Sequence, residues 1–121
     1  MITAKKESFG LPESVIHSLS GIFELTREVD EVVIFGSRAK GNYSEGSDID
    51  LAIKGKSVSL ETILTLMRKA EDLGLLCKMD FINHKTITDS DVLEHIHRVG
   101  KVFWKHDPNY TVKITDSLSL T

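Results

Sequence analysis

Cysteine, proline and long apolar runs are scarce in this sequence of 121 residues. Cys77 is its single cysteine, which excludes an internal disulfide framework and a zinc site built from several cysteines. No stretch approaches the roughly 18 consecutive apolar residues that span a membrane. No apolar run follows the lysines near the N-terminus, as it would in a signal peptide. These absences predict a cytoplasmic protein that makes no membrane contact.

An excess of basic charge is also lacking. The formal net charge is −3, which argues against a broad nucleic-acid-binding surface, because such a surface needs clustered lysine and arginine. Direct binding of nucleic acid is therefore not expected. A single nucleotide is not excluded, since a bound metal ion neutralises its charge locally. The length and the 40% hydrophobic content suit one compact domain.

Hydrophobic periodicity predicts one sheet with helices packed on it. The predicted helices cover residues 11–29, 59–73 and a segment that begins at Asp89 or Ser90, and 37–41 forms a short helical turn. The predicted strands cover 31–35, 47–54, part of 75–83 and 101–104. In the helix 59–73 the side chains expected to face the sheet are Leu60, Ile63, Leu64, Met67 and Ala70. A single domain over 1–104 precedes a polar segment, 105–121, which we expect to be mobile or to become ordered on a partner.

Two aspartates lie one residue apart in the predicted strand 47–54. Alternation places Ile49 and Leu51 on one face and Asp48 and Asp50 on the other, with the two carboxylates about 6.5 Å apart along the strand. Two such carboxylates repel each other, and a hard divalent cation removes that cost. Mg²⁺ prefers oxygen ligands and is usually held by one or two carboxylates and by substrate phosphates.

A third acid and a glycine bend extend this pattern. Asp80 lies between Met79 and Phe81 in the next predicted strand, and it reaches the same face if that strand pairs with 47–54. Gly36 and Ser37 follow a buried strand, where a glycine lets the backbone approach a phosphate and free N–H groups point at an anion. Arg38 follows them and either adds charge to the phosphates or pairs with a surface acid.

These motifs resemble those of the minimal nucleotidyltransferases (MNT) of the DNA polymerase beta superfamily. The resemblance covers residues 12–104 in element order and rests on three segments: Gly36-Ser37-Arg38-Ala39-Lys40-Gly41, Ser47-Asp48-Ile49-Asp50-Leu51, and Asp80 before Phe81-Ile82. It implies an α+β fold with a small mixed sheet. It also implies two Mg²⁺ ions and transfer of a nucleoside monophosphate from ATP or another nucleoside triphosphate to a hydroxyl.

The resemblance further assigns roles to individual residues. Asp48, Asp50 and Asp80 are its implied catalytic residues and metal ligands, and Asp80 helps to deprotonate the acceptor. The implied nucleotide contacts are Gly36, Ser37, Arg38 and Ser47. Small members of the family resemble antitoxins encoded beside a helical HEPN partner, an RNase toxin in many pairs, and some AMPylate a tyrosine of that partner. A homo- or hetero-oligomer is therefore expected.

We favour an enzyme that modifies its partner, but two other functions stay open. The first is an antitoxin that neutralises the partner by covering it. Transfer to a small molecule such as an aminoglycoside is a weaker third possibility, because no second acceptor-binding domain is apparent. The five histidines, including His95 and His97, are interpreted as surface or packing residues, because their spacing does not suit a metal site.

Overall fold

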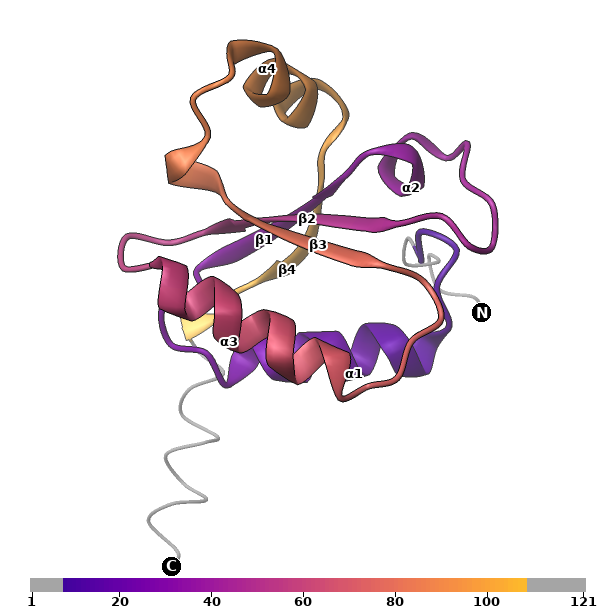
Figure 1. Cartoon of the computed structure of the whole chain (residues 1–121), viewed down its shortest axis with the longest axis horizontal. Coiled ribbons are helices and arrows are strands. Elements are labelled where there is room, and N and C mark those ends of the chain that lie inside the picture. The colour runs from indigo at the N-terminus through magenta and orange to yellow at the C-terminus, as the bar shows by residue number, and fades with distance from the viewer. Residues whose placement is uncertain (1–7, 109–121) are drawn as a thin grey trace, which may run out of the picture.

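The computed structural model describes residues 8–108, and its elements follow the predicted order (Figure 1). The helices are α1 (Glu13–Glu24), α2 (Ser37–Lys40), α3 (Leu60–Glu71) and α4 (Ser90–Val99), with a 3₁₀ turn, η1 (His84–Thr86). The strands are β1 (Glu31–Phe35), β2 (Ile49–Lys54), β3 (Met79–Asn83) and β4 (Lys101–Lys105). The expectation for the C-terminal segment falls largely on 109–121, outside the described residues, and the domain boundary stays a prediction.

The described strands form one mixed sheet in the order β3-β2-β1-β4. β1 runs antiparallel to both β2 and β4, whereas β2 and β3 are parallel. Helices α1 and α3 cover one face of this sheet, and α4 lies on the other face (Figure 1). The mixed sheet and its helices confirm the predicted α+β class.

The alternation along β2 separates two packing layers. Ile49, Leu51 and Ile53 are fully buried against the layer of α1 and α3. Ala52 is also fully buried, but it packs in a second cluster with Ile96 of α4. The face that carries the aspartates is therefore covered by α4 at its middle.

Two helix predictions need correction. α1 ends at Glu24 rather than near residue 29, and the chain then turns toward β1, with the Thr26 N–H donating to the carbonyl of Phe23 and the Val29 N–H to that of Thr26. The predicted inward face of α3 is wrong for Leu60 and Leu64, which are 73% and 50% exposed, and for Met67, which is also exposed. The buried side chains of α3 are Thr62, Ile63, Leu66 and Ala70.

The error in α3 has a simple cause. Apolar residues form two adjacent stripes on this helix, so the 3.6-residue period alone does not decide which stripe faces the sheet. A capping box fixes the start of the helix, with the Ser59 hydroxyl accepting from the Thr62 N–H and the Thr62 hydroxyl accepting from the Ser59 N–H. Within residues 8–108, no helix is long and apolar enough to cross a membrane.

Candidate active site

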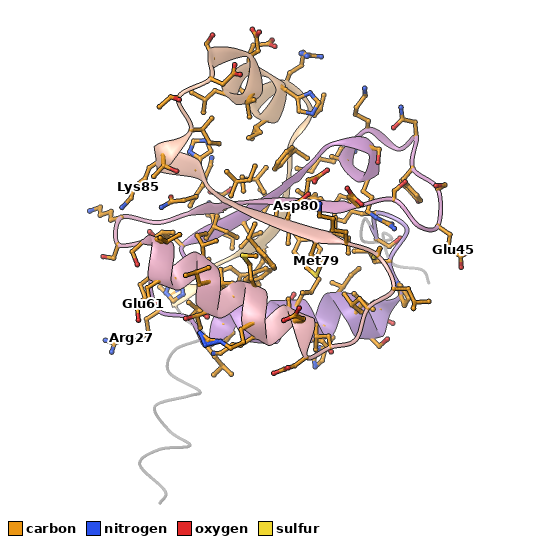
Figure 2. All side chains as sticks on the ribbon, in the orientation of Figure 1. Arg27, Glu45, Glu61, Met79, Asp80 and Lys85 are labelled. Carbon is orange, nitrogen blue, oxygen red and sulfur yellow. The ribbon has the colours of Figure 1, made fainter. Side chains whose placement is uncertain are left out.

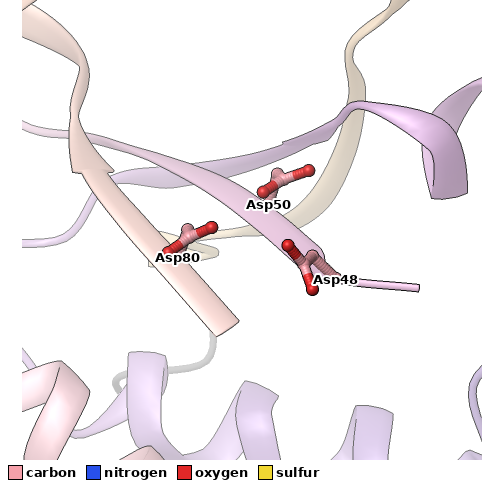
Figure 3. A group of neighbouring side chains, drawn as sticks. All are labelled: Asp48, Asp50 and Asp80. Carbon is pink, nitrogen blue, oxygen red and sulfur yellow. The ribbon is translucent and has the colours of Figure 1, made fainter. Parts of the chain in front are cut away.

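Three carboxylates converge at one end of the sheet. Asp48 is exposed just before β2, Asp50 is half-buried on β2, and Asp80 is half-buried on β3. One oxygen of each lies within 4.8 Å of the others, and the side chains surround a common space (Figure 3). The predicted convergence of these three aspartates is confirmed.

The pairing of β2 with β3 produces this convergence. Asp50 and Asp80 are partners in the parallel register, so their side chains leave the sheet on the same face. Met79 points toward the layer of α1 and α3, and Asp80 points away from it (Figure 2). A shift of one residue in this register would have placed Asp80 on the wrong face.

The three negative charges disfavour one another. The pKa of Asp50 is raised above its ordinary value of 3.8, first by burial, then by the charges of Asp80 and Asp48, and by a hydrogen bond with Asp80. The charge of His95 acts in the opposite direction. Three clustered oxygen ligands with excess negative charge suit a hard divalent cation such as Mg²⁺.

The raised pKa of Asp50 predicts a loss of stability as pH rises. The folded protein holds this proton to a higher pH than the unfolded chain, so the stabilisation is complete below pH 3.8 and is lost as pH rises through the folded-state pKa. Urea unfolding is measured from pH 3.5 to 8 in EDTA. The free energy of unfolding of Asp50→Asn, relative to that of the wild type, should increase with pH and then reach a plateau. Added Mg²⁺ should stabilise the wild type more than the variant. A pH-independent difference would contradict this account.

Gly36 allows the backbone to pass close to these carboxylates. Its φ angle is +76°, and a Cβ at this position would overlap Oδ2 of Asp50. Both observations require glycine here. Ser37 begins α2 directly afterwards, so a short helical turn starts beside the acidic cluster.

Arg38 does not lie with the carboxylates. Its guanidinium is almost fully buried and donates three hydrogen bonds to backbone carbonyls: Nε to Ser47 at 3.0 Å, one terminal nitrogen to Phe9 at 2.9 Å and the other to Glu45 at 3.0 Å. The ring of Tyr43 lies against the cation, 5.3 Å from its central carbon. Arg38 therefore ties the loop before β2 to the segment around Phe9.

Ser47 belongs to the same loop. Its hydroxyl accepts a hydrogen bond of 2.8 Å from the Ser44 N–H, and its carbonyl accepts from Arg38. Because Asp48 follows Ser47 directly, these hydrogen bonds hold the backbone that positions Asp48 in the cluster. The structure thus brings together Gly36 and the three aspartates, and it uses Arg38 and Ser47 within the supporting loop.

A known family matches most of this chain. The model of the family described as polymerase beta, nucleotidyltransferase, matches residues 17–109, a span that contains the glycine bend and all three aspartates. The chain belongs to this family. It is a nucleotidyltransferase, and members of its family use a nucleoside triphosphate and a divalent metal.

Individual relatives agree with the family. A protein of Methanocaldococcus jannaschii, named as a candidate protein adenylyltransferase, is 32% identical over 84 residues, covering 60% of this chain and 67% of its own. A chain of a toxin–antitoxin complex crystallised with AMP-PNP shares the fold with a TM-score of 0.59, at 20% identity over 91% of this chain and 86% of its own. A chain of a Shewanella oneidensis complex between a tri-AMPylated HEPN toxin and an MNT antitoxin has a TM-score of 0.58. It is 14% identical, over 89% of this chain and 84% of its own.

A second surface feature of this nucleotidyltransferase lies away from the carboxylates. A pocket of about 430 Å³ opens between α3 and β3 on the opposite face of the sheet. Its apolar lining comprises Leu64, Met67, Ala70, Leu75, Cys77, Met79 and Phe81. Leu76, beside this pocket in sequence, is fully exposed, as Leu60 and Leu64 largely are. None of the three clustered aspartates lines this pocket.

Proposed function

We propose that this nucleotidyltransferase moves AMP from ATP to a hydroxyl group of a protein partner. The observation that carries the proposal is the convergence of Asp48, Asp50 and Asp80 beside the Gly36 bend, in a chain of this family. The preference for ATP is supported by the adenylyltransferase name of the archaeal relative and by the AMP-PNP in a structure of the same fold.

The carboxylates of Asp48, Asp50 and Asp80 would supply the ligands for two Mg²⁺ ions. Once bound, Mg²⁺ would neutralise the phosphate oxygens and stabilise the charge that develops during transfer. The Gly36 backbone and Ser37 bind the terminal phosphates, since the bend and the start of α2 face the acidic cluster. Arg38 and Ser47 hold the loop that carries Asp48; their contacts with the nucleotide stay a prediction from the resemblance.

The reaction is a substitution at the α-phosphorus. The acceptor oxygen forms a bond to this atom, the bond to the oxygen bridging the β-phosphate breaks, and pyrophosphate leaves. The hydroxyl proton passes to Asp80, which lies at the outer strand of the cluster and remains open to an incoming acceptor. From there the proton is released to water.

The acceptor we propose is a tyrosine of a HEPN-type helical protein. The support comes from the AMPylated HEPN toxin in a complex of the same fold. The exposed apolar side chains beside α3 supply a surface on which a helical partner can pack. The proposed complex is a hetero-oligomer in which the partner also reaches the other face of the sheet and places the tyrosine hydroxyl at the carboxylates.

The test uses the protein encoded beside this chain as acceptor. The purified partner is incubated with the wild-type enzyme, Mg²⁺ and ATP labelled at the α-phosphate or, in a parallel reaction, at the γ-phosphate. We expect label on the partner only from the α-position, and none after the acceptor tyrosine is changed to phenylalanine. If no α-label reaches the partner with any of the four nucleotides, although the complex forms, the proposal is wrong.

A second candidate function is neutralisation by binding alone. The exposed apolar surface beside α3 favours it, because this surface can hold a partner without any chemistry. The Asp48→Ala variant separates the two functions, since Asp48 is exposed and its loss leaves the core intact. A variant that still forms the complex but no longer protects cells supports transfer, whereas full protection supports binding alone.

A further inference from the structure

A row of three side chains crosses the sheet at the active site. Phe35 on β1 is the register partner of Asp50 on β2, and Asp50 is the register partner of Asp80 on β3. Neighbouring strands lie about 4.8 Å apart, so Phe35 and Asp80 are roughly 10 Å from each other. Gly36 follows Phe35, and the glycine bend therefore belongs to the end of the row away from Asp80.

His95 of α4 stands over the Phe35 end of this row. Its imidazole meets the Phe35 ring edge to face, with centroids 6.2 Å apart and planes at 82°. The side chain is only half-buried, and neither ring nitrogen has a hydrogen-bond partner within residues 8–108. Because Phe35 is the register partner of Asp50 and packs with α4, this ring contact sets His95 on the same side of the sheet as the carboxylates.

His95 does not belong to the group of side chains that could hold the metal. The group whose ligand oxygens lie within 4.8 Å of one another contains the three aspartates and excludes this histidine. His95 therefore lies on the Asp50 side of the sheet without belonging to the group of possible metal ligands. Arg38 is less suited to bind a substrate oxygen at the cluster, because its side chain is almost fully buried and its guanidinium donates to three backbone carbonyls.

We propose that His95 is a substrate-binding residue that donates a hydrogen bond to the polyphosphate of the donor nucleotide. The inference rests on the proposed nucleotide transfer and adds a residue and a subsite to it. The polyphosphate is favoured over the acceptor because His95 lies at the Gly36 end of the row, whereas the acceptor enters at Asp80. The proposed role of His95 also revises its interpretation from sequence as a surface or packing residue.

Titration calorimetry with Mg²⁺ tests this assignment without a reaction. The ligands are AMP-PNP, inorganic tripolyphosphate and AMP. His95→Ala should weaken binding of AMP-PNP and of tripolyphosphate by about tenfold each, the factor expected for one hydrogen bond to a charged group. Binding of AMP, which lacks the β- and γ-phosphates, should be unchanged.

Two further variants distinguish a hydrogen bond from packing. His95→Phe keeps an aromatic ring on Phe35 but has no donor, so it should bind as weakly as His95→Ala. His95→Asn keeps an N–H donor and should recover part of the affinity. His97→Ala is the matched control, because His97 is exposed on the same helix and lines a different pocket, beside His84 and Lys54. It should bind all three ligands like the wild type.

The possible failures are distinct. If His95→Phe binds like the wild type, or if AMP is weakened as much as tripolyphosphate, the assignment of His95 is wrong and the proposed transfer stands. If the wild type itself binds neither AMP-PNP nor tripolyphosphate, the proposed function falls and the role of His95 falls with it.

Discussion

Replacing Asp50 with asparagine is expected to lower the rate of nucleotide transfer at least about a thousandfold. Asp50 is the central acid of the cluster, with Asp80 as its register partner and Asp48 two residues before it on the same face. Asparagine keeps the volume and removes the negative charge that holds the cations, which together supply several kcal/mol of transition-state stabilisation. Steady-state transfer from α-labelled ATP measures the effect.

The fold of this variant should survive the change. A neutral amide avoids both the burial of a charge and the repulsion by Asp80 and Asp48, the two causes of the raised Asp50 pKa, so thermal unfolding without metal should occur at or above the wild-type temperature. Asp72→Asn, at the exposed C-terminal end of α3, is the matched control and should retain full activity. A stably folded Asp50→Asn enzyme with more than a tenth of the wild-type rate would show that Asp50 is not an essential ligand.

Replacing Arg38 with methionine should have the largest effect on stability. The change removes the guanidinium N–H groups that now donate to the backbone carbonyls of Phe9, Glu45 and Ser47. Each hydrogen bond to a charged group contributes about 1.5–3 kcal/mol, so the total loss should be at least about 3 kcal/mol. For a domain of this size that corresponds to a fall in Tm of at least about 10 °C. Urea unfolding and thermal scans measure both quantities.

Matched variants make this result specific. Arg68→Met makes the same chemical change on the exposed face of α3 and should alter stability by less than about 0.5 kcal/mol. Arg38→Lys keeps the charge, but one ammonium group cannot reproduce the planar fork that reaches three separate carbonyls, so it should be intermediate. If Arg38→Met unfolds like the wild type, this guanidinium does not hold the loop that precedes Asp48.

The acids were predictable from sequence because they break simple patterns. Asp48 and Asp50 occupy every second position of a β-branched and apolar strand, and Asp80 interrupts another one. Local alternation is enough to place such residues on one face of their own strand. The glycine bend was predictable for a related reason, since Gly36 ends a buried strand and its positive φ confirms the need for glycine.

Arg38 and His95 were not predictable in the same way. An arginine after a Gly-Ser pair suggests phosphate binding, but its actual partners include the carbonyl of Phe9, 29 residues earlier in the chain. His95 is two residues from His97 on one helix, and the local pattern gives no reason to separate them. The packing of α4 on β1 sets His95 against Phe35 and leaves His97 beside another pocket.

The sequence alone determined the order of helices and strands, the α+β class and the identity of the three clustered acids, because these follow from local periodicity and composition. The tertiary structure decided which stripe of α3 is buried, that the cation of Arg38 supports a loop, and that His95 packs against Phe35. These features depend on contacts between residues far apart in the chain. The register of the strands and the packing of the helices decide which face of an element is buried, and the local sequence pattern does not.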